Sequence, residues 1–324
     1  MMDYKNKAIY KEEYHKIASE LCEYGVRCED AEVVADCFAT ADAFGVTTHG
    51  ISVLSAHIDR IKRGGYNLSS QMTVIKETGA FAVIDGDNAL GPVSAKYCLD
   101  YGVKKCKASG VFTVFSRNNN TFGPAFYYSL KAAEAGCIAL VASNSPAQMA
   151  PFGGSEKMLG TNPFSAVIPV VDGDPIIIDF ATSVVAKSKF KEYAQKGHPL
   201  PDGWALDENG RPTNDPEAGM RGFVLPMAGF KGYGISMLID ILAGLLSGAA
   251  HLNGVGRFYS TDEKSMNVGF CLTVLDPYWI FGEEYDAAIK EYVAALRQSN
   301  AVLGEKIVLP GDDRISYKNS LGNG

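Results

Sequence analysis

The sequence predicts a mixed α/β protein without the regular strand–helix alternation of a Rossmann fold. Two observations carry this prediction: helical periodicity over about residues 10–64 precedes the strand-like segments, and no G-x-G-x-x-G fingerprint follows a strand. The nearest match, GFKGYG at 229–234, opens a helix but has the wrong spacing and no ribose-binding acid after it. We therefore expect a helical N-terminal layer beside a mixed-sheet domain.

Three helices and then two short strands are predicted in the first part of the chain. Helical spacing covers residues 10–24 and 29–44, and a third, amphipathic helix begins at Ile51. The period then changes, and residues 72–77 and 80–87 alternate as two strands.

The rest of the chain alternates between helices, strands and long loops. Further helices are predicted at 91–108, 124–135, 232–249 and 282–299, and strands at 110–116, 137–144, 164–171, 175–181, 267–276 and 307–310. Residues 117–123 are expected to form a polar turn, and 146–164 and 198–220 to be loops. Helix 232–249 is apolar enough to be central and buried, and Thr182–Ser183 can cap a helix that follows.

These elements predict two domains. Residues 1–70 form the helical N-terminal domain, joined by the C-terminal residues 282–324, and residues 71–281 form a mixed α/β nucleotide-binding domain.

Composition and charge exclude several classes of partner. The chain has 324 residues, of which 47% are hydrophobic and 21% charged, with a formal net charge of −7. Acidic and basic residues are interspersed without a long basic run, which argues against a nucleic-acid partner and a polybasic membrane anchor. The longest apolar run, 235–250, contains Asp240 and is short for a membrane span, so no membrane partner is expected.

Cysteines and histidines indicate neither a disulfide framework nor a metal site. Seven cysteines are scattered without a C-x-x-C pair, and the first ten residues do not resemble a signal peptide. We therefore expect free thiols in a reducing cytoplasm. The five histidines form no H-E-x-x-H or similar cluster, so no metal is expected.

The stretch ADAFGVTTHG at 41–50 presents a histidine on a glycine-flanked turn before a helix. His49, Val53 and His57 are four residues apart, so they share one face of a helix. A histidine placed in this way can donate a proton near neutral pH. The alternative is that His49 only hydrogen-bonds the turn.

Four other sites carry polar groups that can serve either chemistry or local structure. Asp179 ends an apolar strand, where a carboxylate can hold a histidine in one tautomer or can pair with a backbone amide. Lys231 precedes a buried helix and can meet an anion there or lie in solvent. The amides at 118–120 and the carboxylates at 312–313 can bind a cofactor or belong to turns.

Taken together, these segments resemble the type-2 malate/L-lactate dehydrogenase family, which includes ureidoglycolate and sulfolactate dehydrogenases, diketogulonate reductase and cyclic-imine reductases. The matching motifs span nearly the whole chain. They are A-D-x-x-G-x-x-[ST]-H-G at 41–50, RNxN-x-FG at 117–123, NSPxxMAPFGG at 144–154, LGTNPF at 159–164, DxATS at 179–183, GWALDENGRPTNDP at 203–216, LPMAGFKGYG at 225–234 and LPGDD at 309–313.

The resemblance implies a homodimeric, non-Rossmann oxidoreductase that binds NADH or NADPH, with NAD slightly favoured, and a small-molecule substrate. His49 would be the proton donor, oriented by Asp179. Substrate contacts would come from Thr48, Val53, His57, Asn120 and Thr121. The cofactor would contact Pro175, Ile178, Asp179, Phe180, Ala181, Thr182, Phe230, Lys231, Gly311, Asp312 and Asp313.

The chain departs from the family pattern at the expected substrate positions. Val53 and His57 stand where the family has arginine and tyrosine, and Thr121 stands where it has histidine. Valine cannot bind a substrate carboxylate as arginine does, so a changed substrate is expected, with Arg117, Lys187 or Lys189 as possible replacement cations. The chain also ends soon after Asn319, apparently before the family's C-terminal helix, which can open the site or weaken a dimer.

Three functions remain open at this point. The first is an NAD(P)H-dependent reductase of a 2-oxo acid or related small ketone. The second is a reductase of cyclic imines, which have a C=N bond in place of the carbonyl. The third, from another class, is a catalytically silent dimer that only binds nucleotide.

Overall fold

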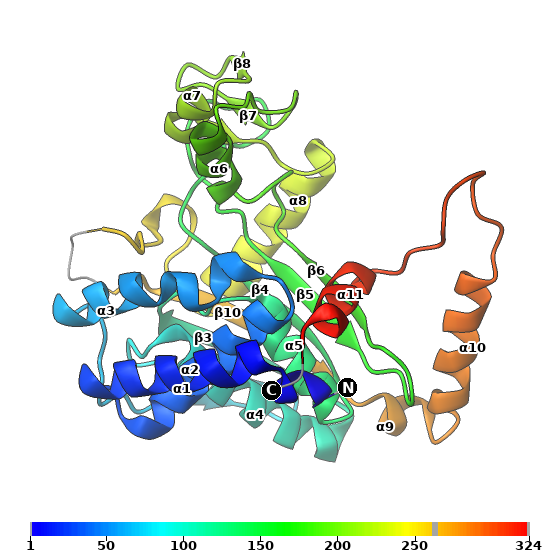
Figure 1. Ribbon diagram of the computed structural model, residues 1–324. Helices are drawn as coiled ribbons and strands as arrows, with labels where there is room; N and C mark the ends of the chain where they lie inside the picture. Colours follow the sequence, from blue (N-terminus) through cyan, green and yellow to red (C-terminus); the bar gives the residue numbers. More distant parts are fainter. Residues whose placement is uncertain (1, 261–264, 323–324) are drawn as a thin grey trace.

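A seven-stranded mixed sheet forms the centre of the protein (Figure 1), and the computed structural model describes residues 2–260 and 265–322. Within this sheet β2 and β3 are parallel and the other neighbouring strands are antiparallel. The mixed α/β prediction is therefore confirmed. In spatial order the strands are β1 (Thr73–Glu77), β2 (Phe81–Asp85), β3 (Val111–Asn119), β10 (Val268–Leu275), β4 (Ile138–Ser143), β5 (Phe164–Ile168) and β6 (Ile176–Phe180).

Helices cover both faces of the sheet. α4 (Gly91–Ser109) packs on β3 and β10, and α5 (Ala125–Glu134) packs on β4 and β5. Successive strand residues point to opposite faces. Leu272 accordingly joins the main core, whereas Cys271 packs with Ala243 in the π-helical segment Asp240–Leu245 on the other face.

The N-terminal helices are α1 (Ala8–Glu23), α2 (Cys28–Ala43) and α3 (Leu54–Lys62). α1 and α2 pack against each other, and their buried side chains belong to the same hydrophobic cluster as those of the central strands. Because this cluster crosses residue 70, the division into two domains stays a prediction. The third helix begins at Leu54, not at Ile51, because two short 3₁₀ turns, Thr47–His49 and Ile51–Val53, precede it.

The C-terminal helix α11 (Asp312–Ser320) returns to the N-terminal segment, and both ends of the chain lie close together (Figure 1). Lys318 Nζ lies 3.0 Å from an Asp3 carboxylate oxygen, and the Tyr317 ring packs against Gly45. The C-terminal residues therefore do form a helix against the segment that leads to His49.

Residues 188–224 form a small lobe rather than the loop expected at 198–220. It contains a three-stranded sheet and two helices packed around Phe190 and Leu200. The elements are too short for a periodic signal in the sequence, which explains the wrong prediction. They are α6 (Ser188–Lys196), β7 (Ala205–Leu206), β8 (Pro212–Thr213), α7 (Pro216–Arg221) and β9 (Phe223–Val224).

The apolar helix predicted at 232–249 is not buried in the single chain. α8 (Phe230–Ile239) and the π-helical segment after it bury one side on the sheet and expose the other. Leu238 is 53% exposed, Leu245 52% and Leu246 55%. The helix is hydrophobic on all sides, which predicted burial. The pattern does not show whether the surface that covers the helix belongs to the same chain.

Helices α9 (Pro277–Phe281) and α10 (Tyr285–Arg297) form an arm that extends from the body of the protein (Figure 1). No residue of α10 is buried, although the helix is amphipathic. The chain then returns through an exposed stretch that includes Val302 and Leu303.

Three local predictions are wrong. Residues 307–310 form no strand, although the Pro310 carbonyl accepts a hydrogen bond from the Ile177 amide at the edge of the sheet. Thr182 and Ser183 cap no helix, because α6 starts only at Ser188. Pairing with β10 extends β3 to Asn119, so much of the expected polar turn is strand. Among the described residues, every helix is too short or too polar to cross a membrane.

Candidate active site

A cleft with two adjoining chambers opens beside His49. The Val53 chamber has a volume of about 740 Å³, and its walls include Val53, His57 and Arg257. The Asp179 chamber has a volume of about 400 Å³, and its walls include Asp179 and Arg314. The two chambers share seven lining residues, Thr48, His49, Thr121, Gly123, Pro146, Thr161 and Phe258.

The turn that carries His49 is fixed by a buried carboxylate at the end of α2. Asp42 Oδ2 accepts a hydrogen bond from the Ile51 amide at 2.6 Å. Gly50 lies so close that a Cβ there would stand 1.9 Å from the same oxygen, so no residue with a side chain fits. On its other side Asp42 hydrogen-bonds Glu13, and burial beside Asp42 raises the pKa of Glu13 to about 8. Burial raises the pKa of Asp42 as well.

His49 remains accessible to solvent from both chambers. Its Nδ1 lies 3.0 Å from Thr48 Oγ1, and no described residue hydrogen-bonds its Nε2. The surrounding protein lowers the pKa of His49 by desolvation, while the negative charge of Asp179 opposes this shift. The imidazole is therefore positioned to exchange a proton with a molecule in the cleft.

Asp179 is held by an arginine that the sequence did not single out. Its Oδ2 lies 2.7 Å from Arg314 Nη2, and both side chains are largely buried. Arg314 comes from the first turn of α11, immediately after the LPGDD motif, which is the signal that could have indicated it. Asp179 makes no recorded hydrogen bond to His49, so it acts on the histidine through its charge.

The predicted cofactor residues of β6 reach the cleft at one end. Phe180 and Ala181 line the Asp179 chamber, whereas Pro175 and Ile178 lie further back along the strand. Thr182 follows; it is fully buried, and its hydroxyl has no hydrogen-bond partner.

Residues 311–313 lie beside β6 but outside the chamber. A Cβ at Gly311 would stand 2.6 Å from that of Ile177, so the two segments are in close contact. Asp312 pairs with Arg297 and accepts a hydrogen bond from the Leu309 amide, and Asp313 is exposed.

Phe230 and Lys231 do not line either chamber. Both are exposed at the start of α8, and the Phe230 ring contacts that of Phe152 with centroids 5.6 Å apart. A separate cavity of about 450 Å³ is lined by Phe152 and Gly229 in this region. The structure thus separates these two residues from the other predicted cofactor contacts.

The Asp179 chamber fits the nicotinamide end of a dinucleotide in volume and in available polar groups. Ligand pockets of about 300–1,000 Å³ are usual. β6 is an edge strand, so part of its backbone is not paired with another strand. Arg314 lines this chamber, and its Nη1 is buried without a partner, so it can bond to a bound molecule. The Thr182 hydroxyl also has no partner, but Thr182 lines neither chamber.

Two of the predicted substrate residues are mainly structural. His57 is 2% exposed, and its Nδ1 lies 2.8 Å from the Tyr66 hydroxyl. Burial, with help from Arg60, lowers the pKa of His57 to about 3, so this wall of the Val53 chamber is uncharged at neutral pH. Asn120 lines neither chamber. It is fully buried, donates to Asn88 and Ala89, and accepts from Arg60.

None of the cations proposed from the sequence lines the Val53 chamber. Arg117 pairs with Asp85, and Lys189 pairs with Glu192. Lys187 is half-buried and donates to the Gly222 carbonyl at 3.1 Å. The arginine that does line this chamber is Arg257, which sequence reasoning missed.

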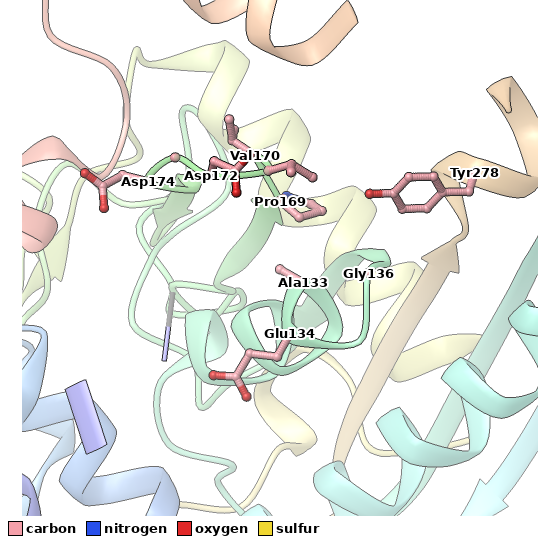
Figure 2. Close-up of a pocket in the computed structure, with 10 residues that line it drawn as sticks. Ala133, Glu134, Gly136, Pro169, Val170, Asp172, Asp174 and Tyr278 are labelled. Carbon is pink, nitrogen blue, oxygen red and sulfur yellow. The ribbon is translucent and has the colours of Figure 1, made fainter. Parts of the chain in front are cut away.

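A further cavity, of about 620 Å³, lies at the opposite end of the β5–β6 hairpin (Figure 2). Its polar groups do not converge, because Glu134 and Asp174 point in different directions and the Tyr278 hydroxyl bonds Asp286. We assign no chemistry to it.

The fold is that of the NAD(P)-dependent 2-hydroxy-acid dehydrogenase family, outside the Rossmann class. The chain belongs to the malate/L-lactate dehydrogenase family, which it matches over residues 10–322.

Three relatives show the range of this family. A malate dehydrogenase from Pyrococcus horikoshii is 39% identical, over 87% of this chain and 80% of its own. An L-sulfolactate dehydrogenase from Methanocaldococcus jannaschii is 36% identical, over 91% and 86%. Ureidoglycolate dehydrogenase (NAD(+)) from Escherichia coli O157:H7 is 32% identical, over 94% and 88%.

Two solved structures have the same fold. The sulfolactate dehydrogenase from Methanocaldococcus jannaschii superposes with a TM-score of 0.90 at 35% identity, covering 96% of this chain and 90% of that one. The delta1-piperideine-2-carboxylate reductase from Pseudomonas syringae pvar. tomato superposes with a TM-score of 0.87 at 26% identity, covering 97% of this chain and 93% of that one.

Proposed function

We propose that the protein reduces the carbonyl of a 2-oxo acid or related small ketone with NADH or NADPH. The observation that carries this proposal is the shared wall of the two chambers, where His49 faces both the Val53 side and the Asp179 side. A cofactor in one chamber and a substrate in the other would meet beside the imidazole.

His49 is proposed to supply the proton of the reaction. The bound cofactor supplies the hydride. His49 protonates the oxygen on which negative charge develops, and in the reverse direction it accepts that proton. The charge of Asp179 favours the imidazolium form that donation requires, against the desolvation that lowers the pKa. Thr48 fixes the ring through Nδ1 and leaves Nε2 for the substrate.

The substrate pocket is proposed to differ from the family pattern at Val53, His57 and Thr121. All three line the Val53 chamber, and none of them carries a charge at neutral pH. An acid group of the substrate therefore has no cationic partner on the α3 side of the chamber.

NAD is proposed as the slightly favoured cofactor, because one relative is named for it.

Reduction of a cyclic imine is a second candidate function, supported by the fold that the chain shares with a piperideine-carboxylate reductase. A silent nucleotide-binding dimer is the candidate from another class, and the loss of the family arginine at position 53 is its support.

A homodimer is proposed from the apolar surface that the single chain leaves uncovered. α8 and the following segment expose Leu238, Leu245 and Leu246, and the α10 arm has no buried residue. Exposed apolar area of this kind marks an interface. A second copy is the occupant that we propose.

His49→Ala tests the mechanism. We expect turnover of a 2-oxo acid to fall by about 10²- to 10⁴-fold, because the proton donor is lost, while cofactor affinity changes little. Initial rates and a cofactor titration measure the two effects separately. His198→Ala is the control, because His198 is exposed outside the cleft. Turnover that survives His49→Ala would remove His49 from the mechanism.

A further inference from the structure

The wall of the Val53 chamber includes a cation. Arg257 lines this chamber together with His49 and Val53. Its guanidinium forms no hydrogen bond or ion pair with any residue of the described ranges 2–260 and 265–322. An unpaired arginine beside a proposed catalytic histidine is available to bind an anionic ligand.

Two lysines add positive charge next to Arg257. Lys157 Nζ donates to the Arg221 carbonyl at 2.7 Å, and Lys187 Nζ donates to the adjoining Gly222 carbonyl at 3.1 Å. The two ammonium groups are thereby held together, and Arg257 is close enough to act on both through its charge. The partners of both ammonium groups are carbonyls and other cations, and neither lysine pairs with a carboxylate of the described residues.

This concentration of like charge is costly for the protein alone. Desolvation together with Lys157 and Arg257 lowers the pKa of Lys187 to about 8, so its protonated form is disfavoured. The chain as a whole has a net charge of −7, so acidic residues outnumber basic ones elsewhere in the sequence. A bound anion would relieve the repulsion that no described carboxylate relieves.

We propose that Arg257, supported by Lys187 and Lys157, binds an anionic tail of the substrate at the end remote from the reacting carbonyl. The tail is a carboxylate, sulfonate or phosphate. The proposal rests on the function proposed above, and it places the anion site at the part of the Val53 chamber that Arg257 lines. A cofactor phosphate is the other source of such an anion, but none of the three cations lines the Asp179 chamber.

Kinetics with two four-carbon substrates test the proposal. Oxaloacetate and 2-oxobutyrate share the carbonyl and its adjacent carboxylate, and only oxaloacetate has a second carboxylate. We expect Arg257→Gln to lower kcat/KM for oxaloacetate by about ten- to a hundredfold, mainly through KM, because a charged hydrogen bond is lost. The value for 2-oxobutyrate should change little. Arg257→Lys should restore part of the loss.

Arg211→Gln is the matched control, because Arg211 is exposed in the small lobe and lines neither chamber. This variant should leave kcat/KM unchanged for both substrates. An unchanged ratio of the two kcat/KM values in Arg257→Gln would overturn the proposal. A weaker affinity for the reduced cofactor with equal losses on both substrates would also overturn it, and would assign the cations to the cofactor.

Malonate separates this proposal from the proposed function. It carries two carboxylates and has no ketone to reduce, so calorimetric titration of the protein with cofactor present reports binding without turnover. We expect malonate to bind more tightly than acetate, and Arg257→Gln to weaken malonate alone. If the unmodified protein reduces neither substrate, the proposed reaction fails, and the malonate titration still decides whether Arg257 binds the anion. Equal malonate affinity in both proteins would refute the anion site.

Discussion

At the scale of single residues, the cleft combines the histidine that we propose as proton donor with an uncharged wall that we propose for the substrate. His49 is exposed to both chambers and is influenced by the charge of Asp179. The wall beside it carries Val53 and a neutral His57, and the cation of the chamber, Arg257, comes from a distant part of the chain. In the proposed function, the reaction type and the substrate preference therefore depend on different residues.

Val53→Arg tests whether this wall sets the substrate preference. An arginine there would offer two parallel hydrogen bonds to a carboxylate next to the carbonyl. We expect kcat/KM for pyruvate to rise by about tenfold, since a charged hydrogen bond contributes about 1.5–3 kcal/mol. Steady-state rates with pyruvate and oxaloacetate measure the effect. Val53→Leu serves as the size control, and an arginine variant no better than it would contradict the altered-pocket account.

The structure brings His49, Thr48, Thr121 and Asp179 into one cleft, and sequence reasoning could single them out because each lies within or beside a local motif. Sequence reasoning failed for residues whose place depends on distant partners. Asn120 belongs to a loop rich in amides, but its side chain is used by Arg60 and Asn88. Arg257 lies outside every motif, so nothing in its neighbours along the sequence indicated it, whereas Arg314 directly follows the LPGDD motif and could have been considered with it.

At the scale of elements, the turn between α2 and α3 fixes the position of His49. The buried Asp42 carboxylate holds the Ile51 amide, and Gly50 leaves room for that carboxylate. The sequence predicted a glycine-flanked turn here. It did not predict the buried acid pair with Glu13, since the spacing of α1 and α2 is a property of their packing.

Gly50→Ala should disturb this turn. The added Cβ would stand 1.9 Å from Asp42 Oδ2, and the turn must move to accept it. We expect a loss of about 1–3 kcal/mol of stability, as for other overpacked sites, together with reduced turnover. Chemical denaturation measures the first and initial rates the second. Gly79→Ala, where a Cβ meets nothing within 4 Å, is the control. Equal stability of the two variants would show that Gly50 is not needed for the turn.

At the scale of the whole molecule, the single chain leaves two apolar surfaces uncovered. One is the outer side of α8 and the segment after it, and the other is the α10 arm that Figure 1 shows extending from the body. The periodicity of these helices was read correctly. The surroundings of these helices could not be predicted. In the sequence, an apolar surface that a second copy covers has the same pattern as one that the same chain covers.

Leu238→Glu tests the proposed dimer. A charge on this surface would remain unpaired after burial, which costs several kcal/mol for each copy. We expect light scattering to report a dimer for the unmodified protein and a monomer for the variant. Ile75→Glu is the control, because Ile75 has a similar exposure, 47% against 53%, on the edge strand β1. A monomeric unmodified protein would contradict the dimer.

The account depends most directly on the binding of a nicotinamide cofactor in the Asp179 chamber. The measurement is a titration of the purified protein with NADH and with NADPH, followed by energy transfer from Trp204 and Trp279 to the reduced nicotinamide. We predict saturable transfer with one of the two cofactors, which would also settle the preference. Transfer with neither would contradict the proposed reductase and leave the family motifs with a structural role only.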